Sequence, residues 1–128
     1  MAAISIMNPP DRPAPETYSF AVEAKGVQRV LHVAGQVGIG ADGVLAAGIE
    51  AQAELVFANI ANILKHAGMT VGNIVKATVY LTEREDREAY ARIRAAAWAG
   101  WKPASTLLFV SGLAHPEMRI EVEVTAVA

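Results

Sequence analysis

The sequence contains no cysteine, which excludes disulfide bonds, thiol catalysis and thiolate metal ligands. Positive charge is not in excess either, because 11 Lys and Arg residues stand against 13 Asp and Glu residues and the formal net charge is -2. No broad positive field is available to attract phosphate groups or anionic lipid. The composition therefore predicts that nucleic acid is not a partner.

Long hydrophobic runs are also missing. No stretch approaches the roughly 20 apolar residues that cross a membrane, and the N-terminus lacks the basic start and apolar run of a signal peptide. We therefore expect no membrane partner and a cytoplasmic location. Apolar residues nevertheless make up 53% of the chain, with a mean hydropathy of +0.29. This surplus in a small chain indicates that a partner covers part of the surface.

A chain of 128 residues is long enough for one hydrophobic core and too short for two, so we expect a single domain over residues 1–128. Residues 7–16 contain four prolines, whose missing N–H groups and fixed φ disfavour regular strand pairing. We expect residues 1–16 to form an extended N-terminal lead-in and the fold to begin near Thr17.

Alternation of apolar and polar residues predicts β-strands at 18–23, 29–34, 75–82 and 119–127. The run 107–110 is apolar without alternation, which predicts a strand buried on both faces. Two short apolar runs flank Asp42-Gly43, and glycine tolerates the positive φ of a tight turn, so a hairpin is expected there.

Apolar residues spaced by three and four predict a helix from Ile49 to Ala67, which Gly68 would end. A second helix is expected from Glu83 to about Trp98, with Thr82 and Glu85 spaced for reciprocal capping. Its inward stripe is predicted to comprise Ala89, Tyr90, Ile93, Ala96 and Ala97, and its charged face Arg84, Glu85, Arg87, Glu88 and Arg92.

This order of elements predicts the α/β (α+β) class, with a mixed six-stranded sheet and two helices on one of its faces. Two helices cannot cover both faces of such a sheet. The other face would carry Tyr80 and part of 107–110, and a neighbouring subunit is the expected cover.

Gly38, Gly40 and Gly43 have the GxGxxG spacing of nucleotide loops. Such loops lead directly into a helix, whereas these glycines precede Val44-Leu45-Ala46, which favours hairpin glycines over dinucleotide binding. The histidines, His32, His66 and His115, lie on separate elements without ligand spacing, so no metal is expected.

Two charged stretches have structural interpretations. Charges of both signs alternate from Glu83 to Arg94, which favours a solvated helix face over an RNA-binding surface. Glu121 and Glu123 lie on one face of the last predicted strand. On spacing alone they are typical of an exposed strand face rather than of an acid/base pair.

Several motifs occur in an order that resembles the RidA family, also called YjgF-like or L-PSP endoribonuclease-like, over residues 17–127. The matching segments are Thr17-Tyr18-Ser19, Val33-Ala34-Gly35-Gln36-Val37-Gly38, Gln52, Asn59-Ile60, Ala67-Gly68, Val75-Lys76-Ala77-Thr78-Val79-Tyr80-Leu81-Thr82, Pro103-Ala104-Ser105-Thr106 and Ile120-Glu121-Val122-Glu123. The resemblance implies a chorismate-mutase-like fold and a homotrimer with three clefts at its subunit interfaces. It also implies cofactor-free hydrolysis of enamines and imines, such as 2-aminoacrylate, to a 2-keto acid and ammonia.

The resemblance also implies roles for individual residues. Glu121 matches the glutamate that positions water, while Tyr18 and Gly35 match residues that line the cleft. Ser105 stands where archetypal members have an arginine that grips the substrate carboxylate. Ala34 and Ala91 replace a serine and an asparagine of the family pattern. Arg119 is a candidate to replace the missing charge, although it lies outside the matching motif.

A serine supplies no full positive charge, so the expected ligand is a small, less anionic metabolite bound in the interface cleft. Glu121 would hold a water or a substrate amine, and Ser105 and Thr106 would offer hydroxyls. Binding of this metabolite is the leading function, and hydrolysis of an enamine, imine or related C–N bond is the reaction that the site could carry out. A non-catalytic ligand-binding or protein-interaction trimer is the alternative. Endoribonuclease activity is less well supported, because the chain is acidic and has no histidine pair.

Overall fold

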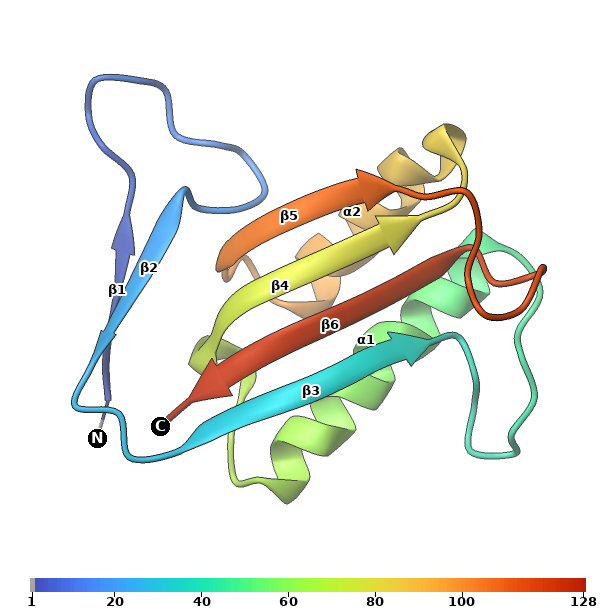
Figure 1. The fold of residues 1–128 in the computed structure, drawn as a ribbon, viewed down its shortest axis with the longest axis horizontal. Coiled ribbons are helices and arrows are strands. Elements are labelled where there is room, and N and C mark those ends of the chain that lie inside the picture. The colour runs from blue at the N-terminus through green and yellow to red at the C-terminus, as the bar shows by residue number, and fades with distance from the viewer. Residues whose placement is uncertain (1) are drawn as a thin grey trace.

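The computed structural model describes residues 2–128. The strands form a four-stranded sheet and a separate pair, and Figure 1 shows the helices on one face of the larger sheet and the pair beside it. The elements are β1 (Ala3–Met7), β2 (Ala21–Lys25), β3 (Val30–Val37), α1 (Ile49–His66), β4 (Ile74–Leu81), α2 (Arg87–Ala97), β5 (Ala104–Phe109) and β6 (Ile120–Val127), with short 3-10 helices η1 (Val71–Asn73) and η2 (Arg84–Asp86).

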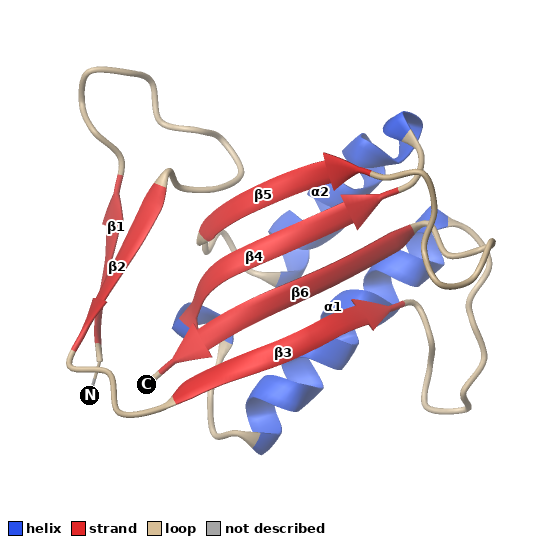
Figure 2. Cartoon of the chain, in the orientation of Figure 1, coloured by secondary structure: helices blue, strands red, loops and turns tan. Residues whose placement is uncertain are grey.

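The six strands form two sheets rather than one. β1 pairs with β2, and the larger sheet has the order β3-β6-β4-β5 (Figure 2). β6 runs antiparallel to both neighbours, whereas β4 and β5 are parallel and joined through α2. A single bridge between Ser19 and Ala104 links the segment before β2 to β5. The predicted mixed sheet with two helices on one face is thus confirmed, but it has four strands rather than six, because β1 and β2 pair separately.

Regular pairing begins at Ala3, because Ala3–Met7 pairs in register with Ala21–Lys25. The expected start of the fold near Thr17 is therefore wrong. The predicted strand 18–23 is displaced as well, since β2 begins at Ala21. The prolines occupy the connection between these two strands, where no ladder hydrogen bond needs their missing N–H groups.

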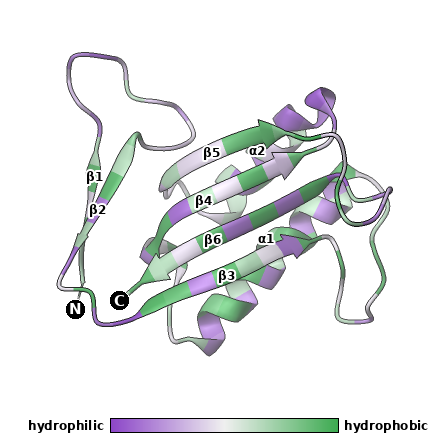
Figure 3. Cartoon of the chain, in the orientation of Figure 1, coloured by the Kyte–Doolittle hydropathy of each residue, from purple (hydrophilic) through white to green (hydrophobic). Residues whose placement is uncertain are grey.

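The hydrophobic core lies between the two helices and the larger sheet. On β6, the side chains of Ile120, Val122, Val124 and Ala126 are buried, and alternate positions lie on the other face, which appears as alternating bands along β6 in Figure 3. This confirms the alternation predicted for 119–127. The buried set includes Val33, Ala53, Val56, Phe57, Ile60, Leu64, Ile74, Ala77, Val79, Leu81, Tyr90, Ile93 and Trp98.

The first predicted helix and the hairpin before it are confirmed. α1 ends at His66, and Gly68 has φ 70°, a conformation that favours glycine. Gly43 has φ 78°, and Ile39 and Leu45 form an isolated bridge around the turn. The buried Gln52 side chain ties this loop to the 115–119 loop by donating to the carbonyls of Ala46 (3.0 Å) and Glu117 (2.9 Å).

The second helix differs from its prediction in three respects. Residues 84–86 form the 3-10 helix η2 instead of the first turn of the α-helix. No side chain caps the N-terminus of η2 or of α2, so the predicted reciprocal cap of Thr82 and Glu85 is wrong. Ala96 and Ala97 are exposed rather than inward. Arg94 is buried instead, because it lies four residues from both Tyr90 and Trp98 on the same helix face.

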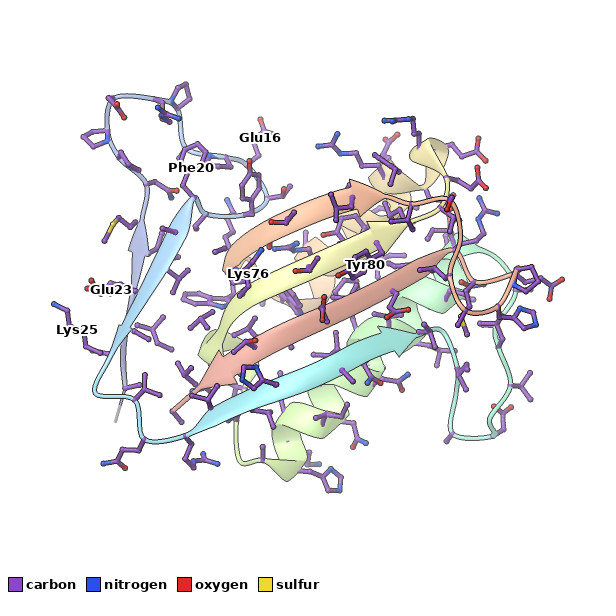
Figure 4. All side chains as sticks on the ribbon, viewed as in Figure 1. Glu16, Phe20, Glu23, Lys25, Lys76 and Tyr80 are labelled. Carbon is purple, nitrogen blue, oxygen red and sulfur yellow. The ribbon has the colours of Figure 1, made fainter. Side chains whose placement is uncertain are left out.

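The face of the larger sheet away from the helices carries mostly polar side chains. Lys76 and Tyr80 lie along β4 on this face (Figure 4), and Glu123 of β6 accepts a hydrogen bond from the Tyr80 hydroxyl. Leu108 on β5 is 45% exposed, so burial of both faces of 107–110 is wrong for the chain by itself. The side chains on this face are therefore not apolar enough to require, by themselves, a neighbouring subunit that covers them.

Candidate functional site

Three of the predicted site residues line one cavity of about 430 Å3 between α2 and β5. Tyr18, Ser105 and Thr106 lie in its wall together with Arg87, Tyr90, Arg94 and Phe109. The segment carrying Tyr18 is fixed there by Ser19, whose backbone N–H donates to Pro103 (3.2 Å) and whose hydroxyl donates to the Lys102 carbonyl (2.5 Å). The cavity is therefore assembled from segments far apart in sequence.

Ser105 faces α2. It pairs with the buried Ala77 across the parallel strands, so the two side chains lie on the helix-covered side of the sheet. Its hydroxyl accepts a hydrogen bond from Arg94 Nη2 at 2.7 Å and donates to the Pro103 carbonyl at 3.4 Å. The serine is thus engaged with an arginine that sequence analysis placed on a solvated surface.

Arg94 is only 4% exposed. Its Nη1 donates to the Tyr90 hydroxyl at 2.6 Å, and its guanidinium carbon lies 4.6 Å from the centre of the Trp98 ring. Burial raises the pKa of the Tyr90 phenol, and the positive charge of Arg94 opposes that rise. Arg94 is not among the site residues predicted from the sequence, although its spacing of four from two aromatic residues was the available signal.

Glu121 and Gly35 form a second group on the neighbouring strands β6 and β3. A Cβ atom built at Gly35 would lie 1.8 Å from Glu121 Oε2, so the carboxylate rests directly over the glycine backbone. The pairing of β3 with β6 shifts register between Val33 and Gln36, next to this contact. Glu121 and Gly35 are therefore in direct contact, and residue 35 can carry no side chain while the carboxylate keeps this position.

The two groups do not meet within one chain. Glu121 pairs with Tyr80 and faces away from the helices, whereas Ser105 faces α2, and neither Glu121 nor Gly35 lines the cavity of Tyr18. Thr106 lies between them, because it borders the cavity while its hydroxyl accepts a hydrogen bond from Lys76 Nζ at 2.8 Å. The five predicted residues thus form two half-sites on different faces of the sheet.

Arg119 does not replace the missing arginine within the chain. Its Nε and Nη2 donate to the buried Asp86 at 2.8 and 2.6 Å, and this hydrogen bonding raises the pKa of the Arg119 guanidinium further. The side chain borders a different hollow, beside Glu83 and Glu85. Its charge is therefore already balanced by a carboxylate.

Glu123 has a structural partner that Glu121 lacks. The Tyr80 hydroxyl donates to Glu123 Oε1 at 2.5 Å, and this hydrogen bond, more than desolvation, raises the pKa of Tyr80. Burial lowers the pKa of the nearby Lys76, and the charge of Glu123 opposes that change. The two glutamates of β6 therefore have different surroundings.

Among residues 2–128, no helix is long and apolar enough to cross a membrane. No group of three or more His, Cys, Asp or Glu side chains in the same range could hold a metal ion.

The fold and these half-sites define a class of α+β proteins in which two helices cover one face of a mixed sheet. The endoribonuclease L-PSP family model matches residues 10–128, and the chain belongs to this family, which is the RidA family recognised from its motifs. The chorismate-mutase-like fold predicted from the same motifs is thereby confirmed.

Individual relatives agree with this assignment. The chain is 32% identical to the 2-iminobutanoate/2-iminopropanoate deaminase of Mus musculus over 112 residues, covering 86% of this chain and 80% of that protein. It is 41% identical over 76 residues to a RutC family protein of Aquifex aeolicus, and this match spans only 58% of either chain. The structure of YyfB, a conserved Rid family protein from Yersinia pestis, superposes with a TM-score of 0.88 at 33% identity over 98% of both chains.

Proposed function

We propose that this protein is a homotrimer whose interface clefts hydrolyse small imines, or the enamines from which they form, to carbonyl compounds and ammonia. The observation that carries the proposal is the division of the site. Tyr18 and Ser105 border one cavity, whereas Glu121 and Gly35 lie together on the other face of the sheet. A neighbouring copy that brings its Glu121 to the cavity would complete one site at each interface.

In this proposal Glu121 acts as a general base. Water adds to the imine carbon while the carboxylate accepts one of its protons, and a C–O bond forms as the C=N double bond becomes single. That proton passes from the carboxylic acid to nitrogen, which gives a carbinolamine. The hydroxyl proton then follows it to nitrogen by way of the carboxylate, so that the C–N bond breaks and ammonia leaves as the carbonyl forms. One imine and one water thus give one carbonyl compound and one ammonia without any cofactor.

The deaminase name of the mouse relative supports this reaction class. The surroundings of Glu121 support its role, because its carboxylate lies over a glycine and has no ion-pair partner within 4.0 Å among residues 2–128. Such a carboxylate is free to hold a water. The cytoplasmic location predicted from the sequence stays a prediction.

The test is hydrolysis of 2-iminopropanoate generated in situ, followed as pyruvate released above the rate without protein. Glu121→Gln should lower the protein-dependent rate at least ~100-fold, the usual scale for loss of a general base. Glu123→Gln is the matched control on the same strand face, and it should retain activity because Glu123 is bonded to Tyr80. An unchanged rate in Glu121→Gln would refute the proposal. Ligand binding without hydrolysis by the wild type would favour the non-catalytic trimer.

A further inference from the structure

A buried arginine with no carboxylate partner lies in the wall of the cavity described above. Arg94 is 4% exposed, and none of the ion pairs within 4.0 Å among residues 2–128 involves it. Its guanidinium partners are two neutral hydroxyls, those of Tyr90 and Ser105. A buried charge is ordinarily paired with an opposite charge, so the Arg94 guanidinium is suited to bind an anion.

The cavity has the electrostatic character that such an anion needs. Its lining includes two guanidinium groups, Arg87 and Arg94, and no acidic side chain. Glu16 borders a smaller hollow that Arg94 also lines, but it makes no ion pair with the arginine. The charged side chains with which one chain lines the cavity are therefore both basic, although the whole chain carries a formal charge of -2.

The position of the guanidinium is fixed before any ligand arrives. Nη1 is held by Tyr90 one turn earlier on α2, Nη2 is held by Ser105 on β5, and the guanidinium group lies over the Trp98 ring one turn later. A guanidinium held in this way loses little conformational entropy when it binds a carboxylate. Ser105 thus acts as a support for an arginine that comes from the helix.

We propose that Arg94 binds the carboxylate of a small monoanionic ligand, with Arg87 adding positive charge at the cavity mouth. This inference deepens the proposed function by naming the ligand's chemical class, and it rests on that proposal only for the placing of the ligand in this cavity. It replaces the expectation of a less anionic ligand. That expectation assumed that, with serine at residue 105, no positive charge remains in the cavity. The helix, rather than β5, supplies the missing guanidinium.

The experiment compares binding of 2-oxobutanoate with binding of its neutral analogue 2-oxobutanamide by titration calorimetry on the full-length protein. The wild type should bind the carboxylate about 10- to 100-fold more tightly than the amide, the range expected for charge-assisted hydrogen bonds. Arg94→Gln should remove this preference and leave amide binding unchanged. Arg92→Gln is the matched control, because Arg92 lies on the same helix with its side chain 64% exposed and paired with Glu50.

Arg94→Lys keeps the test decisive if Arg94→Gln does not fold, as judged by circular dichroism and mass in solution. Lysine retains the charge without the two-pronged donor geometry, so carboxylate affinity should fall about 10-fold while amide affinity is retained. Equal wild-type affinities for the two compounds, or unchanged carboxylate affinity in the Arg94 variants, would overturn the inference. Carboxylate binding through Arg94 without imine hydrolysis would refute the proposed function alone. Hydrolysis with no dependence on Arg94 would refute this inference alone.

Discussion

The Glu121 carboxylate lies against the backbone of Gly35, so close that a side chain at residue 35 would overlap Oε2. Gly35→Ala should therefore displace the carboxylate and lower imine hydrolysis at least ~10-fold, since displacement of about an ångström can cost 100-fold. The fold should survive, because the displaced group is the end of a flexible side chain. Pyruvate release measures the effect.

Gly112→Ala is the control for that substitution. A Cβ at Gly112 meets no atom within 4 Å, so this variant should match the wild type in activity and in denaturant midpoint. Full activity in Gly35→Ala would show that the contact does not position Glu121.

The divided site predicts complementation between subunits. Glu121→Gln and Tyr18→Ala each damage one half-site, so each variant alone should be inactive. Refolding the two together in equal amounts should restore about a quarter of the wild-type activity, because half of the chains offer each intact half and the halves combine at random. Measured mass should be three times 13.5 kDa.

Two results would contradict this arrangement. A monomer at micromolar concentration would show that no interface exists to complete the site. Absence of any recovered activity in mixed trimers would show that both half-sites act within one subunit.

The buried Asp86 is predicted to contribute to stability through Arg119. Asp86→Asn would weaken two short hydrogen bonds, at 2.6 and 2.8 Å, and should lower the free energy of unfolding by about 2 kcal/mol. Urea denaturation at fixed protein concentration measures the change. Glu85→Gln is the control, because Glu85 is 77% exposed at 3.6 Å from Arg119 and should contribute less than about 0.5 kcal/mol. Equal losses in both variants would contradict this ranking.

The Tyr80 hydrogen bond predicts a loss of stability at alkaline pH. The fold raises the pKa of Tyr80 above 10.0, so the folded chain holds the phenol proton more tightly than the unfolded chain. The resulting stabilisation is complete below pH 10 and is lost as the pH rises through the folded-state pKa. Urea midpoints between pH 8 and 11 should therefore fall more steeply for the wild type than for Tyr80→Phe.

Comparison of these two proteins separates the Tyr80 contribution from that of Lys76. Burial lowers the pKa of Lys76, so its contribution has the opposite sign and is present in both proteins. Parallel pH dependences would show that the hydrogen bond to Glu123 does not control the ionisation of Tyr80.

Regular elements with strong local patterns could be predicted from the sequence. The helix predicted at 49–67 occurs at 49–66, and the strand predicted at 119–127 occurs at 120–127, because side-chain periodicity reports directly which face is buried. β1 was missed because its partner lies beyond the prolines. Its side chains are almost all exposed, so no buried face imposes an alternating pattern on it.

The sequence by itself determined the family, the two helices, the alternation of β6 and the presence of a serine at residue 105. Only the tertiary structure decided that Arg94 is buried and hydrogen-bonded to Ser105, since this contact depends on how α2 lies against β5. It also decided that Glu121 and Ser105 lie on opposite faces of the sheet. The physical reason is that local periodicity fixes which side of an element a residue occupies, whereas contact between elements depends on how they pack in three dimensions.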